Sequence, residues 1–174
     1  LEFRRVLFRS KEKGNSVQGA ILFSQKKFNC VGCHAQGATN LLGPDLTRVG
    51  TDVPDGHFVE SILQPSKVIK KGYETVSILD IDGRVVKGRI VDETPKHYVL
   101  RDTSTEQRLV TVPRDSIQQL KIDAKSSMPE GLADQLQNRQ EFLDLVKYLM
   151  DIAASGSADT VAAGPQQRSG LDAR

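Results

Sequence analysis

The residues with the clearest capacity for chemistry are two cysteines and a histidine in one short segment. Cys30 and Cys33 are the only cysteines of the chain, and His34 directly follows the second of them. Two thiols three residues apart can form thioether bonds to the two vinyl groups of one porphyrin, and the adjacent imidazole can then bind the iron. The pattern therefore predicts one covalently attached haem c, with Cys30 and Cys33 on the porphyrin and His34 on the metal.

Three other kinds of site could use the same cysteines. A structural disulfide would suit an exported protein but would not need His34. A thioredoxin-like redox pair follows a strand in a βαβ unit, whereas this pair follows a predicted helix. A zinc site needs four ligands, and His57, His97 or carboxylates would have to complete it at no recognisable spacing. We favour haem, and keep a zinc- or disulfide-stabilised interaction domain as an alternative.

A second axial ligand is expected, because electron-transfer haems commonly have two. Met128 lies in the segment Ser126-Ser127-Met128-Pro129, where the proline stiffens the loop and could hold the sulfur in place. Met150 lies within a predicted helix, where filling the core is the usual role of methionine. We predict Met128 as the distal ligand, with His57 and His97 as the alternatives.

A turn-forming segment, residues 43–46 with the sequence Gly-Pro-Asp-Leu, follows His34 along the chain. A ligating histidine usually donates its second ring N–H to a carbonyl or carboxylate, and we expect the Pro44 carbonyl to accept it. Arg48 is a candidate partner for a haem propionate. Five apolar side chains are expected to form the wall of the haem pocket: Leu41, Leu46, Phe58, Ile62 and Leu132.

Helical patterns occur on both sides of the Cys-x-x-Cys-His motif. A helix over 16–27 follows the N-cap residue Asn15, and a short helix is predicted over 55–63. A third helix, over about 138–152, begins at the cap residue Asn138 and has apolar residues at helical spacing.

β-branched residues dominate the stretch from about residue 73 to 122. Five strands are predicted there, with Asp82-Gly83 as a two-residue hairpin turn between the first two. Residues 113–116 are expected to form a single turn before the last strand. The predicted strands are 73–81, 84–91, 97–100, 108–112 and 117–122. Their spacing predicts a small antiparallel sheet or barrel between the helices.

The two ends of the sequence are expected to lie outside the folded domain, which we place at residues 11–152. Residues 1–10 match the translation of a common sequencing-library adapter and are interpreted as an artefact. The native start, and any signal peptide, would then be absent from this fragment. Residues 153–174 are mostly small and polar, and are expected to form a disordered tail or linker.

The charge of the chain gives no argument for a nucleic-acid partner. The net charge is +2, but basic and acidic residues balance once residues 1–10 are set aside. No apolar run approaches the length needed to span a bilayer, so no transmembrane segment is expected in this fragment.

Together these motifs resemble a class I cytochrome c. The shared features are Gly19 and Phe23 on the first predicted helix, the CVGCH and GPDL segments, the Met-Pro loop, and LVKYL in the last helix. The resemblance implies that the first and last helices cross near the haem, with Gly19 allowing close approach and Phe23 and Tyr148 packing nearby. The spacing between Phe23 and Cys30 is longer than in many small cytochromes.

A narrower resemblance is to the haem-binding domain of planctomycete-type c cytochromes, which is often found at the C-terminus of large exported bacterial proteins. It covers about residues 16–150 and depends on several motifs in combination: residues 43–46, 60–63, 65–67, 72–74, 82–84 and 127–131. It implies a mainly α cytochrome c fold with a small antiparallel β insert at about 73–122, α+β overall.

We therefore expect a monohaem c-type cytochrome domain that carries single electrons and is not itself an enzyme. Its partner would be a separate redox protein or a fused dehydrogenase domain, for which it would serve as the electron-exit module. Covalent haem c implies attachment outside the cytoplasm, which predicts a periplasmic or cell-surface location. The other alternative is a haem-based ligand-binding or catalytic domain with an open axial position.

Overall fold

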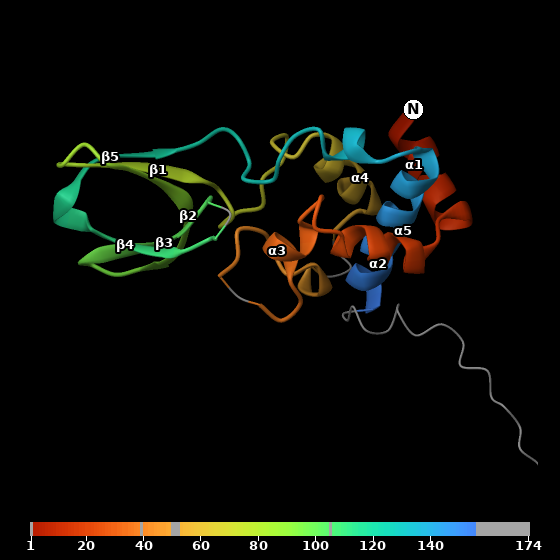
Figure 1. Cartoon of the computed structure of the whole chain (residues 1–174), viewed down its shortest axis with the longest axis horizontal. Helices are drawn as coiled ribbons and strands as arrows, with labels where there is room; N and C mark the ends of the chain where they lie inside the picture. The colour runs from red at the N-terminus through yellow and green to blue at the C-terminus, as the bar shows by residue number, and fades with distance from the viewer. Residues whose placement is uncertain (1, 39, 50–52, 105, 156–174) are drawn as a thin grey trace, which may run out of the picture.

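The structure, a computed structural model, describes residues 2–38, 40–49, 53–104 and 106–155. Figure 1 shows helices gathered at one end of the long axis and a β-sheet at the other, with helix α3 between them. The helices are α1 (Glu2–Lys13), α2 (Ser16–Ser24), α3 (Cys30–His34), α4 (Asp55–Leu63) and α5 (Arg139–Ser155). Short 3-10 turns are η1 (Leu46–Arg48), η2 (Arg114–Ser116) and η3 (Leu132–Gln135). The strands are β1 (Val76–Asp80), β2 (Val85–Glu93), β3 (His97–Asp102), β4 (Leu109–Pro113) and β5 (Ile117–Ile122).

The expectation of a mainly α cytochrome c fold is wrong. The structure has about 40% helix and 21% strand, and the five strands form one antiparallel sheet in the order β4-β3-β2-β1-β5. The sheet has its own apolar core of Val76, Ile78, Leu100 and Val112, which is separate from the core of the helical half. The β region is therefore a second half of the molecule and not a small insert in a helical frame.

The helical half is organised around the contact between α2 and α5. Gly19 lies at a close approach of the two helices, and a Cβ added there would sit 2.1 Å from the carbonyl oxygen of Asp144. Phe23 packs beside Tyr148, with ring centroids 5.4 Å apart. The close approach at Gly19 and the packing of Phe23 and Tyr148, which the resemblance implied, are both present.

Polar caps fix the ends of these helices. The Asn15 side chain accepts hydrogen bonds from two N–H groups in the first turn of α2, and its backbone N–H donates to the Asp144 carboxylate at 2.7 Å. Asn138 caps α5 by accepting from the Glu141 N–H at 3.1 Å. Both caps were predicted, and α4 has its predicted bounds, whereas α2 ends at Ser24 instead of residue 27.

Helix α1 includes most of residues 1–10, which were expected to lie outside the folded domain. It packs against α4 and α5. Val6 and Ser10 are buried, and the Ser10 hydroxyl donates to the Val6 carbonyl at 2.9 Å. Lys11 forms an ion pair with Asp55 at the start of α4. Residues 2–10 thus belong to a helix with a buried face, which the sequence did not predict. The interpretation of residues 1–10 as an adapter artefact stays a prediction.

The sheet follows the predicted strand order closely. β5 has its predicted bounds and pairs with β1, which also pairs with β2. The first hairpin differs from the expected two-residue turn. The N–H of Asp80 donates to the carbonyl of Arg84 at 3.0 Å, so residues 81–83 form a three-residue loop.

Two neighbouring arginines connect the sheet to the helical half. Arg89 on β2 and Arg101 on β3 are direct cross-strand partners. Arg89 donates to the carbonyls of Leu41 and Gly72, and Arg101 donates to the carbonyl of Asn40 at 2.7 Å. These bonds hold the segment that leads to residues 43–46 against the end of the sheet.

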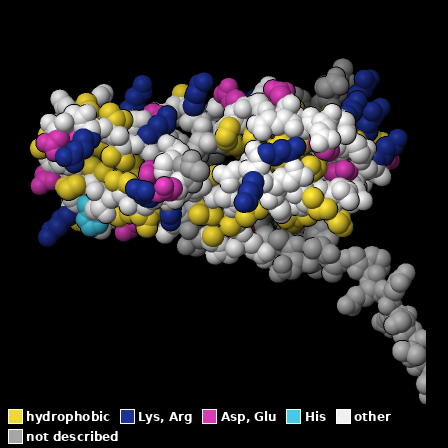
Figure 2. All heavy atoms as spheres, in the orientation of Figure 1, with side chains coloured by type: hydrophobic (Ala, Val, Ile, Leu, Met, Phe, Trp, Pro, Cys, Tyr) yellow, Lys and Arg dark blue, Asp and Glu magenta, His cyan; other side chains and the backbone are white. Residues whose placement is uncertain are grey.

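The surface has mixed character on both halves. Figure 2 shows acidic and basic side chains interspersed over this face, with apolar side chains gathered over the sheet end. Exposed apolar residues of the strands include Val85, Leu109 and Ile122. Within the part of the chain that the structure describes, no helix has the length and apolar character needed to cross a membrane.

Replacement of Gly19 by alanine tests the helix contact. The added methyl group would meet the backbone of Asp144, so we expect the free energy of unfolding to fall by about 1–3 kcal/mol. Gly56→Ala on α4 is the matched control, because a Cβ there meets no atom within 4 Å and alanine favours a helix. Urea unfolding followed by circular dichroism compares the two variants, and equal stabilities would contradict the close approach of α2 and α5.

Candidate functional site

The two cysteines and the histidine lie on α3, a short helix between α2 and a long loop. Asn29 precedes α3 in the left-handed conformation, with φ of 52°, and turns the chain sharply after α2. At the other end of α3, the Gly43 N–H donates to the Cys33 carbonyl at 3.1 Å. The motif is therefore held by a turn on one side and by the following loop on the other.

The imidazole of His34 is partly buried and has a defined partner. Its Nδ1 lies 2.8 Å from the carbonyl oxygen of Pro44. A carbonyl can only accept, so Nδ1 carries a proton and Nε2 is the basic nitrogen of the neutral ring. The expected hydrogen bond to Pro44 is confirmed. Burial lowers the pKa of His34 and outweighs the opposing effect of this bond, so the ring is held in the neutral form that can bind a metal.

The loop after α3 is shaped to receive this ring. A Cβ at Gly43 would lie 2.4 Å from Cε1 of His34 and 2.7 and 2.8 Å from its two ring nitrogens, so only glycine leaves room. The Asp45 carboxylate fixes the loop by accepting from the N–H groups of Gly37 at 2.9 Å and Thr47 at 3.0 Å. Burial acts to raise the pKa of Asp45, but a hydrogen bond from the Thr47 hydroxyl at 2.7 Å, the two N–H bonds and the charge of Arg48 together lower it, which keeps the carboxylate charged.

A cavity of about 450 Å³ adjoins His34. Cys30, Cys33 and Met128 line the same cavity, so the groups predicted to bind the cofactor lie together. Its size is within the range of small-molecule and cofactor sites. Most of the remaining wall is apolar. The predicted residues found on it are Pro44, Leu46, Phe58, Ile62 and Leu132, and further apolar residues on it include Phe23, Phe28, Leu42 and Leu149.

Two residues predicted for the haem site do not line this cavity. The carbonyl of Leu41 accepts from Arg89 of the sheet, and its neighbour Leu42 is the buried residue on the wall. Arg48 ends η1 and is not among the residues that line the cavity, so the expected propionate contact gains no support. The direction in which an irregular loop turns each side chain is set by contacts distant in sequence, and spacing alone does not reveal it.

Two candidate distal ligands, Met128 and His57, line the cavity. Met128 packs against the helical core, and its backbone N–H donates to the Ser126 hydroxyl at 3.1 Å, which orders the loop. His57 lies on α4 with its Nε2 3.3 Å from the Ser61 hydroxyl. Met150 is buried in the core on α5, as expected.

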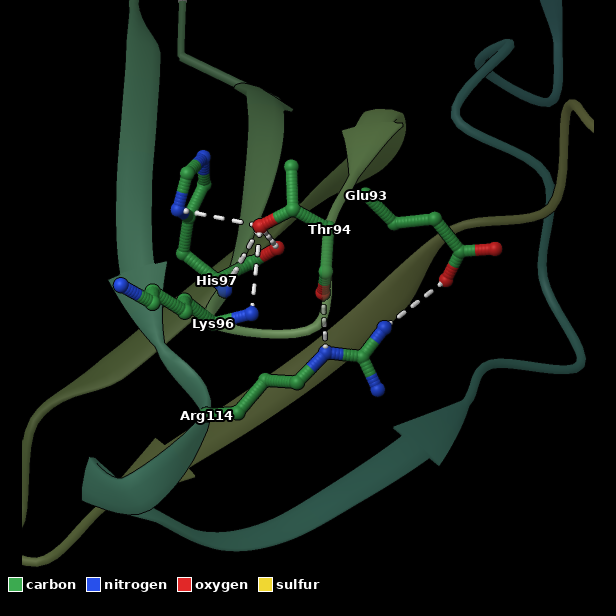
Figure 3. A network of polar contacts seen from close by, with 5 residues as sticks. All are labelled: Glu93, Thr94, Lys96, His97 and Arg114. Atoms are coloured by element: carbon green, nitrogen blue, oxygen red, sulfur yellow. Dashed lines mark hydrogen bonds and ion pairs between the residues drawn. The ribbon is translucent and has the colours of Figure 1, made fainter.

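His97 belongs to a different network in the sheet half. Its Nδ1 lies 3.2 Å from the Thr94 hydroxyl at the turn between β2 and β3 (Figure 3). Arg114 supports the same turn, because its Nε donates to the Thr94 carbonyl at 2.7 Å and its Nη2 pairs with Glu93 at 3.2 Å. His97 does not line the cavity, so it is not a ligand candidate in this structure.

The surroundings of the two thiols are unlike those of a reactive redox pair. Burial raises the pKa of Cys30 to about 11. Burial also raises the pKa of Cys33, although a hydrogen bond from Gln107 opposes the effect. Both groups are protonated at neutral pH and neither forms a disulfide in this structure, whereas a thioredoxin-like pair depends on a thiolate.

Several polar residues at the site were missed from the sequence. Lys70 and Tyr73 line the cavity, and the guanidinium group of Arg89 stacks on the Tyr73 ring at 4.0 Å. Gln107 donates to the sulfur of Cys33 at 3.5 Å. Of these residues, only Tyr73 lies in a segment, residues 72–74, on which the resemblance to the planctomycete-type haem-binding domain was based. The other three are brought to the site by folding.

Comparisons with protein-family models and with curated proteins gave no match for this chain. Among the residues that the structure describes, no group of three or more His, Cys, Asp and Glu side chains is placed to hold a metal ion. The case for a function depends on the cavity and the groups that line it.

The neutral, partly buried ring of His34 predicts a pH dependence of stability in the haem-free protein. The pKa of His34 is lower in the folded chain than its usual value of 6.5, so the unfolded chain binds the proton more readily. The contribution of His34 to the free energy of unfolding is therefore fully present above about pH 6.5 and is lost as the pH falls toward the folded-state pKa.

Urea unfolding of the haem-free protein and of its His34→Gln variant, between about pH 7.5 and 5, measures this contribution. The unaltered chain should lose more of its free energy of unfolding over that interval than the variant, because the other titrating groups are present in both. Equal losses would contradict a desolvated, neutral imidazole.

Proposed function

We propose that this chain binds one haem c covalently and carries single electrons. The observation that supports the proposal is the shared cavity, which is lined by Cys30, Cys33, His34 and Met128 and is otherwise mainly apolar. The two sulfurs would hold the porphyrin through thioether bonds, and His34 would bind the iron through Nε2. Bound haem supplies reversible one-electron chemistry between ferric and ferrous iron.

The chain's own residues would orient the ligand and exclude water. The Pro44 carbonyl keeps Nδ1 of His34 protonated, which leaves Nε2 for the metal, and Gly43 leaves space for the ring. The Asp45 hydrogen bonds keep this loop in place. Apolar side chains such as Phe58 and Ile62 would limit the access of water, which favours the less charged ferrous haem and raises the reduction potential.

The proposed setting follows from the chemistry of attachment, and the proposed partner follows from one-electron transfer. Haem c is attached outside the cytoplasm, so we place the function in the periplasm or at the cell surface. The chain would exchange electrons with a separate redox protein or with a dehydrogenase domain fused to it. It would itself be an electron-transfer domain and not an enzyme.

A pair of methionine replacements tests this function at the distal position. Met128→Leu conserves volume but removes the sulfur, so we expect the spectrum of the reduced haem protein to change from six-coordinate low-spin to high-spin, with new binding of carbon monoxide. Met150→Leu is the matched control, since Met150 lies in the core away from the cavity. It should keep the unaltered spectrum at a stability cost below about 1.5 kcal/mol.

Other spectra of these haem proteins would identify a different distal ligand or favour a different function. Loss of the low-spin spectrum in His57→Gln, with no change in Met128→Leu, would make His57 the distal ligand. A high-spin, carbon monoxide-binding spectrum in the unaltered chain would contradict electron transfer through a six-coordinate haem. That result would favour the haem-based ligand-binding or catalytic alternative.

A further inference from the structure

Gln107, in the sheet half, contacts the cysteine motif. Gln107 lies in the connection between β3 and β4, just before β4 begins. Its amide Nε2 donates to the carbonyl of Gly32 at 3.0 Å and to the sulfur of Cys33 at 3.5 Å. Gly32 lies near the C-terminal end of α3, where helix carbonyls lack a partner within the helix. Gln107 supplies that partner and contacts one of the two attachment sulfurs at the same time.

This arrangement includes two unfavourable features. Gln107 has a φ of 46°, in the left-handed region that residues with a side chain rarely adopt. Its Oε1 is buried without a hydrogen-bond partner among the described residues. Both features lower stability, so a gain in fold stability does not by itself explain this placement.

The backbone of Gln107 is also anchored to the sheet. Arg101 on β3 donates through Nη1 to the Gln107 carbonyl at 2.7 Å and through Nε to the Asn40 carbonyl at 2.7 Å. One arginine thus holds both the residue that contacts Cys33 and the start of the loop that leads to Pro44. The sheet end, α3 and the His34 loop form one connected set of polar contacts.

We infer that Gln107 is a positioning residue that fixes the Cys33 sulfur and so connects the sheet to the haem. The inference deepens the proposed function and rests on it. An N–H group directed at the sulfur places a positive dipole beside the edge of the porphyrin that the sulfur binds. That dipole favours the extra electron of the ferrous state and raises the reduction potential.

The test compares reduction potentials of haem proteins matured in a haem-attaching host. Gln107→Met keeps similar length without a donor, and Gln107→Ala removes the side chain. Gln119→Met is the matched control, because Gln119 is exposed on β5. We expect both Gln107 variants to have a lower potential than the unaltered chain, and Gln119→Met to have the same potential. Failure of both Gln107 variants to bond haem through Cys33, with normal attachment in Gln119→Met, would also support the positioning role.

Unchanged potentials in both Gln107 variants, with both thioether bonds present, would overturn the inference and leave the proposed function intact. Absence of haem from the unaltered chain would overturn both. Amide hydrogen exchange of the haem-free protein gives a second measurement that does not depend on maturation. The N–H groups of α3 should exchange faster in Gln107→Met than in Gln119→Met, while those of α5 stay protected, and equal exchange in α3 would contradict the contact.

Discussion

The structure around the cavity depends on the position and orientation of the His34 ring. The hydrogen bond from Nδ1 to the Pro44 carbonyl and the contact with Gly43 together fix the tautomer, the orientation and the burial of the imidazole. The ring in turn requires the 43–45 loop to pass directly over it. Since that loop is continuous with Leu42 and Leu46, its position also directs two apolar side chains to the cavity wall.

The two halves of the molecule contribute different things to the site. The helices α2, α4 and α5 supply part of the apolar wall, and the segments that connect the elements supply the larger part. The sheet has a separate core, and it reaches the site through the polar side chains of Arg89, Arg101 and Gln107. This division would let the apolar walls determine the shape of the cavity while polar contacts from the sheet fix the backbone around α3.

Features with a local physical cause were the ones that could be predicted from the sequence. The Asn15 cap, the bounds of α4 and β5, and the acceptance of the His34 proton by Pro44 depend on residues close together in the chain. The fold class was wrong because strand patterns do not reveal that a sheet will bury its own core. The position of Leu41 and the contact of Gln107 with Cys33 could not be predicted, because both depend on contacts between distant segments.

The central claim is that Cys30, Cys33 and His34 anchor one haem, and its most direct test is the intact mass of the chain after maturation in an exporting, haem-attaching host. Under denaturing conditions, the mass should exceed that of the bare sequence by one haem, and the double replacement Cys30→Ser, Cys33→Ser should return it to the bare value. A chain that keeps its bare sequence mass in a host that matures a known c-type cytochrome would contradict the account.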